Sequence, residues 1–236
     1  LEEIESAIFA LRLSSSKPLK PGWIHEVIRG TIFSSAYHGE LEPLKAIIKH
    51  SNNTIIDLHD DCDMCSLHWA ALEGHVEIVE YLLDYGANVN ELNHGLNSAL
   101  MLAASRGHDH IVMLLKNRGA DIFIRNLKDR DALYMAVLYA HRSRGLPNII
   151  QSLTAGGVDL NEIDATGSAP IHECSSRNLS RPVLLLVDAG ANVNITHSRN
   201  GLTPLQMACS ANILDVETVR ALLDKGAYPN WKDASR

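Results

Sequence analysis

The segments GHVEIVEYLLDYGANVN (74–90) and GHDHIVMLLKNRGADIF (107–123) repeat one pattern at an interval of 33 residues. Each opens on Gly-His, continues with apolar residues at helical spacing, and closes on Gly-Ala followed by a polar residue. Gly157 and Gly190 open GVDLN and GANVN at the same interval. A period of this length indicates stacked supersecondary units, each burying its apolar face against its neighbours.

Two motifs recur along most of the chain. The first is found as CSLHWAALEG (65–74), SALMLAASRG (98–107), APIHECSSRN (169–178) and TPLQMACSAN (203–212), with weaker copies GTIFSSAYHG (30–39) and DALYMAVLYA (131–140). The second is found as LLDYGANVN (82–90), LVDAGANVN (186–194) and LLDKGAYPN (222–230). These segments resemble the T-P-L-H-x-A-A-x-x-G and L-L-x-x-G-A-D-V-N motifs of the ankyrin-repeat family. The resemblance implies an all-α ankyrin-repeat solenoid of about six helix-turn-helix units with β-turn fingers.

Each part of the pattern has a physical role. A Ser or Thr before the first helix can cap its free backbone amides, and Pro is tolerated at the first helical position. Paired alanines let neighbouring helices approach closely. The Gly after the second helix suits a left-handed backbone, which is unfavourable for residues with a Cβ.

The domain organisation follows from the limits of the repeats. Apolar residues at helical spacing in residues 1–13, followed by SSSKPLKPG, predict an N-terminal capping helix and linker over residues 1–29. The repeat domain is expected over 30–236, with WKDASR starting a further unit, so we expect the chain to be part of a longer protein. Surplus residues near 140–148 predict a protruding loop or a lengthened helix in the fourth repeat. Smaller surpluses fall near HSRNG and SANILD.

Composition limits the classes of function. A formal net charge of −7 argues against a general nucleic-acid or acidic-membrane binder, since such binding needs a basic face. The longest apolar runs are far shorter than a membrane span, so no membrane insertion is expected. Four cysteines without a disulfide framework, and no visible leader sequence, favour the cytoplasm, with the nucleus as an alternative. Sequons at Asn52, Asn178 and Asn194 leave secretion as a minor alternative.

The segment HDDCDMCSLH raises the hypothesis of a zinc site. His59, Cys62, Cys65 and His68 recur every three residues, and imidazole and thiolate are preferred zinc ligands. In the repeat frame, however, His68 occupies the motif histidine, whose ring is implied to bridge backbone groups near the turn. His172 occupies the same place without neighbouring cysteines. We therefore favour the structural interpretation and expect no metal or other cofactor, with the zinc module kept as an alternative.

No pattern of residues predicts catalysis. Cys174 and Cys209 fall at small-residue positions of first helices and are expected to be buried, inert thiols. Neither phosphate-binding glycine motif, G-x-x-x-x-G-K-[ST] or G-x-G-x-x-G, is present. The chain is therefore predicted not to be an enzyme.

Function is expected on the concave side, where the resemblance places partners against first helices and fingers. The candidate contact positions are those that the motif leaves free: Tyr37, His38, Met64, Leu72, Glu73, His94, Ser105, Arg106, Lys128, Arg130, Leu138, Tyr139, Arg177, Arg199, Asn200 and Ser210. Apolar, aromatic and Arg residues at such positions favour protein recognition, although Leu138 and Tyr139 could instead cover the enlarged fourth repeat. Trp69 is expected in the core.

The predicted function is binding of a partner protein or linear peptide in this groove. The alternative is a substrate-recruiting or regulatory segment of a larger enzyme or channel, for example a ubiquitin ligase receptor. A further possibility implied by the resemblance is hydroxylation of Asn90, Asn161 or Asn194, each of which follows a Leu by eight residues.

Overall fold

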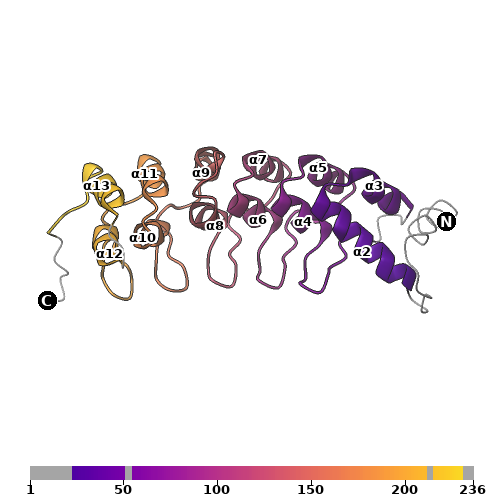
Figure 1. Cartoon of the computed structure of the whole chain (residues 1–236), viewed down its shortest axis with the longest axis horizontal. Coiled ribbons are helices and arrows are strands. Elements are labelled where there is room, and N and C mark those ends of the chain that lie inside the picture. The colour runs from indigo at the N-terminus through magenta and orange to yellow at the C-terminus, as the bar shows by residue number, and fades with distance from the viewer. Residues whose placement is uncertain (1–22, 51–54, 212–214, 231–236) are drawn as a thin grey trace.

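The computed structural model describes residues 23–50, 55–211 and 215–230 of the 236. Within these residues the chain forms twelve α-helices and one isolated β-bridge, between Leu92 and Ser98. The helices form six consecutive pairs, arranged as a single elongated array (Figure 1). The predicted all-α ankyrin-repeat solenoid is confirmed.

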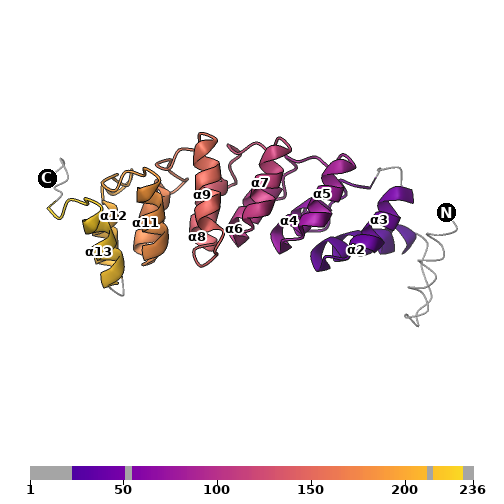
Figure 2. The same cartoon turned by 90° about the horizontal axis from the view of Figure 1, so that it is seen from above.

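Each pair has a first and a second helix. The first helices are α2 (Trp23–His38), α4 (Ser66–Glu73), α6 (Ala99–Arg106), α8 (Ala132–Tyr139), α10 (Pro170–Ser176) and α12 (Pro204–Ser210). The second helices are α3 (Leu41–His50), α5 (Val76–Asp84), α7 (Asp109–Asn117), α9 (Leu146–Ala155), α11 (Ser180–Asp188) and α13 (Val216–Asp224). First helices lie in one layer and second helices in another (Figure 1), so that the second helices overlie the first in the view from above (Figure 2).

The core runs continuously along the array between the two layers. Its first-helix side includes pairs of small residues: Ala70, Ala71, Ala103 and Ala104 are fully buried, as the motif predicts. Leucines and isoleucines of the second helices, such as Leu82, fill the space behind them. Because every unit buries its apolar side chains against its neighbours, the array behaves as one core rather than as six.

Local hydrogen bonds explain where the first helices begin. The side chains of Ser98, Asp131 and Thr203 accept from the backbone amides of Met101, Tyr134 and Gln206, which are free at a helix N-terminus. In α4 the His68 ring holds a different amide, that of the residue before the helix: Nδ1 accepts from the Cys65 amide at 3.1 Å, and Nε2 donates to the Glu91 carbonyl at 2.9 Å. The structural role predicted for His68 is therefore confirmed.

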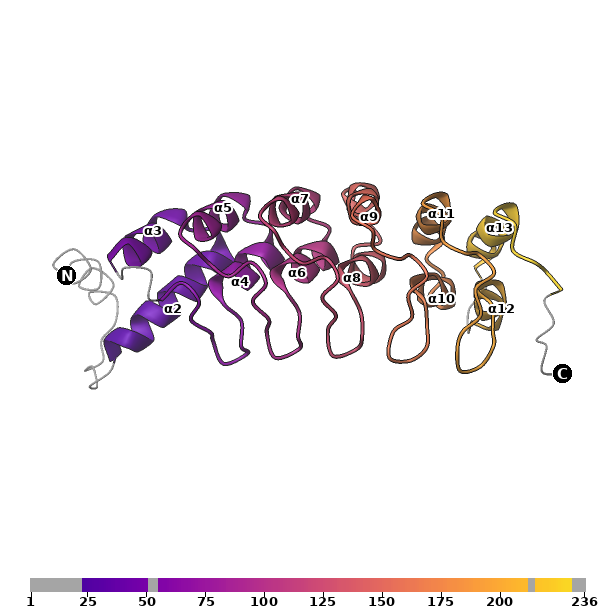
Figure 3. The ribbon, with the colours of Figure 1, turned by 180° about the vertical axis from the view of Figure 1, so that it is seen from behind.

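Five finger loops project from the array on the side of the first helices (Figures 1 and 3). In each finger one side chain accepts hydrogen bonds from the backbone that follows, as Asn93 Oδ1 does from the amides of Gly95 and Asn97. Asp60, Asn126, Asp164 and His197 take the same place in the other four fingers. Three neighbouring finger pairs are also joined through backbone bonds, beginning with Leu127 N to Gly95 O at 3.1 Å. The fingers are therefore held in a fixed row.

The N-terminal end differs from the sequence prediction. Helix α2 has 16 residues and contains the expected boundary between residues 29 and 30, so the first helix of the first unit begins earlier than its motif suggests. The capping helix expected near residues 1–13 lies outside the described residues, as does the WKDASR segment at 231–236.

The fourth unit accommodates its surplus in the connection between its helices. Residues 140–145 link α8 to α9, whereas residues 74–75 and 107–108 suffice in the second and third units. The loop does not stand free: Ser143 Oγ donates to the Gly107 carbonyl at 3.1 Å, and Arg181 donates to the Ser143 carbonyl at 2.9 Å. Of the two alternatives, a loop is present, but it is tied to the units on both sides.

Candidate partner-binding surface

Predicted contact residues on the first helices fall into two rows of equivalent positions, which also include Ser176 and Ala211, two residues that were not among the predictions. One row holds the residue two places before the motif glycine, or before the residue that replaces it: Tyr37, Leu72, Ser105, Leu138, Ser176 and Ser210. The other holds the residue one place before it: His38, Glu73, Arg106, Tyr139, Arg177 and Ala211. Because the motif recurs at the same place on each first helix, members of a row follow one another from unit to unit.

Most predicted contact residues reach the surface. The exposed ones are Tyr37, His38, His94, Arg106, Lys128, Tyr139, Arg177, Arg199, Asn200 and Ser210, and the half-buried ones are Leu72, Glu73 and Ser105. Whether any of them contacts a partner stays a prediction, since accessibility is a necessary condition only.

Met64 and Leu138 are buried, so the prediction of their exposure is wrong. Met64 is 6% exposed, and the Asn93 side-chain amide of the next finger lies 3.1 Å from its sulfur. Leu138 is 2% exposed, and the loop that follows α8 returns over its backbone, with His141 Nδ1 3.2 Å from the Leu138 carbonyl oxygen. Leu138 therefore serves the enlarged fourth unit, which was the alternative, whereas Tyr139 remains exposed.

Arg130 is also buried, contrary to prediction, with 6% of its surface exposed. Its Nε and Nη2 atoms donate to Asp164 Oδ2 at 2.9 and 2.7 Å, and Glu173 lies 3.6 Å away. The guanidinium group also lies 4.7 Å from the centre of the Tyr134 ring. Arg130 therefore joins the fourth unit to the fifth.

The electrostatics of this pair favour charged Asp164. Burial raises the pKa of the Asp164 carboxyl, but hydrogen bonds from the Thr166 hydroxyl and the Arg130 guanidinium outweigh it and lower the pKa to about 2. Arg130 responds in the complementary direction: burial lowers its pKa, and the bond to Asp164 more than offsets this. Both groups are therefore ionised at neutral pH.

A pocket opens on the first-helix side between α6 and α8. Ser105, Arg106, Met135 and Tyr139 line a volume of about 380 Å³. Tyr139 is 49% exposed, and among the described residues Arg106 has one long charged contact, 3.9 Å from its Nη2 to Glu73 Oε1. An aromatic face beside a loosely held guanidinium can take up an apolar side chain and an anionic group together.

Two aromatic residues extend this face towards the N-terminal end. The Tyr37 and Trp69 rings meet edge to face with centroids 5.4 Å apart. Trp69 packs against the core, as predicted, yet stays half exposed, and its Nε1 donates to Asp60 Oδ2 at 2.8 Å. Its polar edge is therefore satisfied by the first finger.

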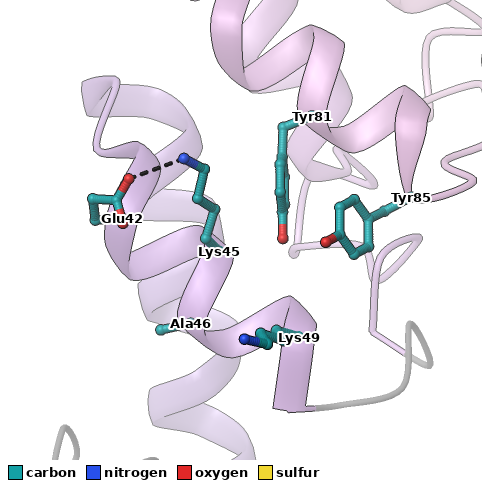
Figure 4. A pocket seen from close by; sticks show the side chains of 6 residues that line it. All are labelled: Glu42, Lys45, Ala46, Lys49, Tyr81 and Tyr85. Atoms are coloured by element: carbon teal, nitrogen blue, oxygen red, sulfur yellow. Dashed lines mark hydrogen bonds and ion pairs between the residues drawn. The ribbon is translucent and has the colours of Figure 1, made fainter.

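Sequence reasoning missed a second pocket, which lies between the second helices α3 and α5 on the outer layer (Figure 4). Glu42, Lys45, Ala46, Lys49, Tyr81 and Tyr85 line about 470 Å³. Lys45 Nζ is 3.0 Å from Glu42 Oε1 and 5.9 Å from the centre of the Tyr81 ring, which lies 4.4 Å from that of Tyr85. Burial and a hydrogen bond with Tyr85 raise the pKa of Tyr81 to about 12. The sequence could have indicated this pocket, because Lys45 and Lys49 are four residues apart in one unit and Tyr81 and Tyr85 are four residues apart in the next.

The described residues contain no cluster of side chains of the kind that the zinc hypothesis requires. No group of three or more His, Cys, Asp or Glu side chains suited to a metal occurs in the described ranges, which include all of residues 59–68. Cys65 is buried, which raises the pKa of its thiol to about 11, and burial lowers the pKa of His68. The raised pKa of the thiol opposes the thiolate that zinc binds, and both ring nitrogens of His68 are already engaged with the backbone of Cys65 and Glu91.

The remaining cysteines differ from each other. Cys174 is fully buried, as predicted, and burial raises the pKa of its thiol. Cys209 is exposed, so the prediction of a buried thiol there is wrong. The equivalent Ala71 and Ala104 are covered by the next first helix, whereas α12 is the last first helix of the described residues.

The asparagines considered for hydroxylation bridge successive units. The side-chain oxygens of Asn90, Asn161 and Asn194 accept from the backbone amides of Asp121, Asn192 and Tyr228 at 2.8, 2.7 and 2.9 Å. Each asparagine thus bonds the backbone of the next unit rather than its own turn. Hydroxylation of these residues stays a prediction.

Comparison with known proteins agrees with this geometry. The family model for ankyrin repeats, in three copies, matches residues 29–93, 67–143 and 133–233. ZDHHC13 of Danio rerio, which carries the name of a palmitoyltransferase, is 29% identical over 92% of this chain and 31% of its own length. The nuclear factor NF-kappa-B p105 subunit of Gallus gallus is 33% identical over 75% of this chain and 18% of its own.

An L-asparaginase of Dirofilaria immitis is 28% identical over 92% of this chain and 35% of its own length. The chain thus spans about a third or less of each of these three relatives. In the described ranges, no helix combines the length and the apolar character needed to cross a membrane.

Proposed function

Because this chain belongs to the ankyrin-repeat family, we propose that it binds a partner protein or linear peptide on the surface formed by its first helices and fingers. The observation that carries this proposal is the pocket between α6 and α8, with Tyr139 half exposed beside Arg106. Large aromatic side chains and arginines are the residues most often responsible for binding energy at protein interfaces.

The rigidity of the surface supports the same function. The last four fingers are joined to one another through backbone hydrogen bonds, and alanines of the first helices are buried between neighbouring units. A surface that is already ordered loses little conformational entropy when a partner binds. No catalytic step is proposed for this chain. The three relatives are about three or more times as long, so the activities in their names belong to much longer proteins.

The test is affinity capture from cell extract with matched variants. Tyr139→Asp places a charge on the first-helix side, whereas Met113→Asp places the same charge on the outer helix α7, where Met113 is 48% exposed. Circular dichroism establishes that both variants keep their helices. We expect proteins retained by the parent chain and by Met113→Asp to be lost from Tyr139→Asp. Equal retention by both variants contradicts the proposed surface.

The second candidate is that this array recruits substrates or regulates activity within a larger enzyme or channel. It is favoured by the names of two relatives, a palmitoyltransferase and an asparaginase, of which the chain covers only a part. This candidate predicts that the captured partner becomes a substrate of the full-length protein. It is tested by assaying modification of that partner by the full-length protein with and without Tyr139→Asp.

A further inference from the structure

Arginines gather along one edge of the first-helix surface, where α6, α8 and α10 end. Arg106, Tyr139 and Arg177 occupy equivalent places in three successive units, so the tyrosine has an arginine in the unit on either side. Arg106 and Arg177 are 57% and 46% exposed in their side chains. The arrangement places two cations around the one aromatic residue that lines the pocket between α6 and α8.

The long connection of the fourth unit adds to the same edge. It begins directly after Tyr139 and carries Arg142 and Arg144, both exposed. Within the described part of the chain, neither guanidinium group has a hydrogen bond or an ion pair. The loop itself is fixed, through Ser143 to Gly107 on one side and through Arg181 to the Ser143 carbonyl on the other. The surplus residues therefore present two unpaired cations on an anchored backbone.

The balance of charge at this edge opposes that of the whole chain. Five arginines meet there, namely Arg106, Arg142, Arg144, Arg177 and Arg181, whereas the chain has a formal net charge of −7. Three carboxylates lie among them. Glu73 is 3.9 Å from Arg106, Glu173 bonds Arg177 at 3.1 Å, and Asp109 accepts from Asn148 beside the loop. We define the arginine edge as these five arginines together with Tyr139.

We propose that the arginine edge binds an acidic peptide segment of a partner protein. A large apolar side chain of that segment occupies the pocket beside Tyr139 and Met135, and flanking Asp or Glu carboxylates pair with Arg106, Arg142 and Arg144. Guanidinium groups suit this task because they bind carboxylates through two parallel hydrogen bonds. This inference rests on the proposed function and adds the chemical class of the partner.

The charge of the chain outside the arginine edge favours a peptide over a nucleic acid. Outside the arginine edge the chain carries an excess of carboxylates, among them Asp57, Asp60, Asp61 and Asp63 around the first finger. A nucleic acid extending along the array would meet these charges, whereas a short acidic segment confined to the edge would not. The carboxylates of the first finger also disfavour an acidic partner segment that continues to the N-terminal end.

The experiment selects short random peptides, displayed on phage, against the whole chain, and then measures the affinity of a labelled consensus peptide by fluorescence anisotropy. The test variant is Arg142→Glu with Arg144→Glu, chosen because neither side chain has a partner whose loss could unfold the chain. The control is Arg118→Glu with Arg220→Glu, which makes the same change in net charge directly after α7 and on α13. Because Arg118 gives up a surface ion pair with Asp84, circular dichroism must establish that this control keeps its helices.

We expect the selected peptides to share one large apolar residue flanked by Asp or Glu. Reversal of two nearby charges should weaken binding about tenfold, since each exposed pair contributes up to about 1 kcal/mol and becomes repulsive. The control should bind within about twofold of the parent chain, and higher ionic strength should weaken binding to the parent.

Four results overturn the inference. Peptides without acidic residues whose binding Tyr139→Asp abolishes refute the acidic partner but leave the proposed function intact. Peptides that bind Tyr139→Asp as tightly as the parent chain refute both the acidic partner and the proposed binding surface. A single-stranded thymidine oligonucleotide that binds as tightly as the consensus peptide refutes the peptide in favour of a nucleic acid. Failure to select any peptide also refutes this inference, while capture of a folded protein partner would still support the proposed function.

Discussion

Replacing Arg130 with alanine should destabilise the chain by about 3 kcal/mol, because it leaves the Asp164 carboxylate buried without its partner. The Asp164 side chain is fully buried, and its pKa falls from 3.8 to about 2 in the folded chain. A fall of that size corresponds to about 2.4 kcal/mol in favour of the charged form. Removing one member of a buried ion pair costs about 3–5 kcal/mol in other proteins, which is the same order.

The matched control is Arg125→Ala in the same finger. Arg125 bonds Asp129 and Glu162, but both carboxylates are half exposed or more, so the loss should not exceed about 1 kcal/mol. The measurement is urea denaturation followed by circular dichroism at about pH 7, with the slope compared among variants to confirm equal exposure on unfolding.

A second substitution separates charge from packing. Asn93 and Asn126 occupy the place of Asp164 in other fingers and accept the same backbone bonds, so Asp164→Asn keeps the finger while removing the charge. The double variant Arg130→Ala with Asp164→Asn should therefore recover most of the loss, to within about 1 kcal/mol of the parent.

Acidification independently tests whether the charged form of Asp164 stabilises the folded chain. Because the pKa of Asp164 is lowered by folding, its contribution is present above pH 3.8 and is lost as pH falls towards 2. In Arg130→Ala the bonds from Thr166 and Ser168 to the carboxylate remain, but the guanidinium no longer lowers its pKa. The pKa of Asp164 should therefore lie higher than in the parent, and the difference in stability between parent and variant should shrink on acidification. A loss as small as that of Arg125→Ala, or no recovery in the double variant, would refute the reasoning.

Three further results follow from the structure. Burial lowers the pKa of His172 from 6.5 to about 4, so the free energy of unfolding should fall by up to about 3 kcal/mol as pH drops through that range. His172→Gln, which places the residue of the equivalent Gln206 there, should remove this pH dependence, as measured by urea titrations. Leu96 has a left-handed backbone with φ of 56°, so Leu96→Gly should stabilise the chain by about 1 kcal/mol and raise the melting temperature by about 2–4 °C, measured by calorimetry. Cys62 and Cys209 should react with a thiol reagent in the folded chain, whereas the two buried cysteines should react only after denaturation.

The sequence predicted the fold well because the repeat places the same constraint at many positions. Ala71 and Ala104 are small because the next helix touches them, and Gly86 is glycine because its φ is 93°. His68 and His172 likewise gave their structural role through the motif that contains them. Such residues make contacts within one unit or between equivalent positions of neighbouring units, so the repeat period alone is enough to predict their role.

The candidate surface was predicted less completely, because exposure depends on side chains that belong to other units. Met64 occupies a finger position, yet the side chain of the next finger covers it. Arg130 resembles a solvent-facing contact residue until Asp164 and Glu173 are placed beside it from the following unit. Cys209 shows the converse, since its motif position is buried only where another first helix follows.

Different residues of the same helices thus determine the fold of the family and the choice of partner. The row that contains Glu73, Arg106, Tyr139 and Arg177 changes charge and character at each step, while the alanines three places before the first two do not change. The core therefore constrains this row very little, and its members are free to be selected for what they bind. The longer loop of the fourth unit continues the same logic: its backbone is tied to Gly107 and Arg181, whereas its two arginines have no structural task in the described residues. Side chains that folding does not require, held on a backbone that folding does fix, are where the specificity of this chain should be sought.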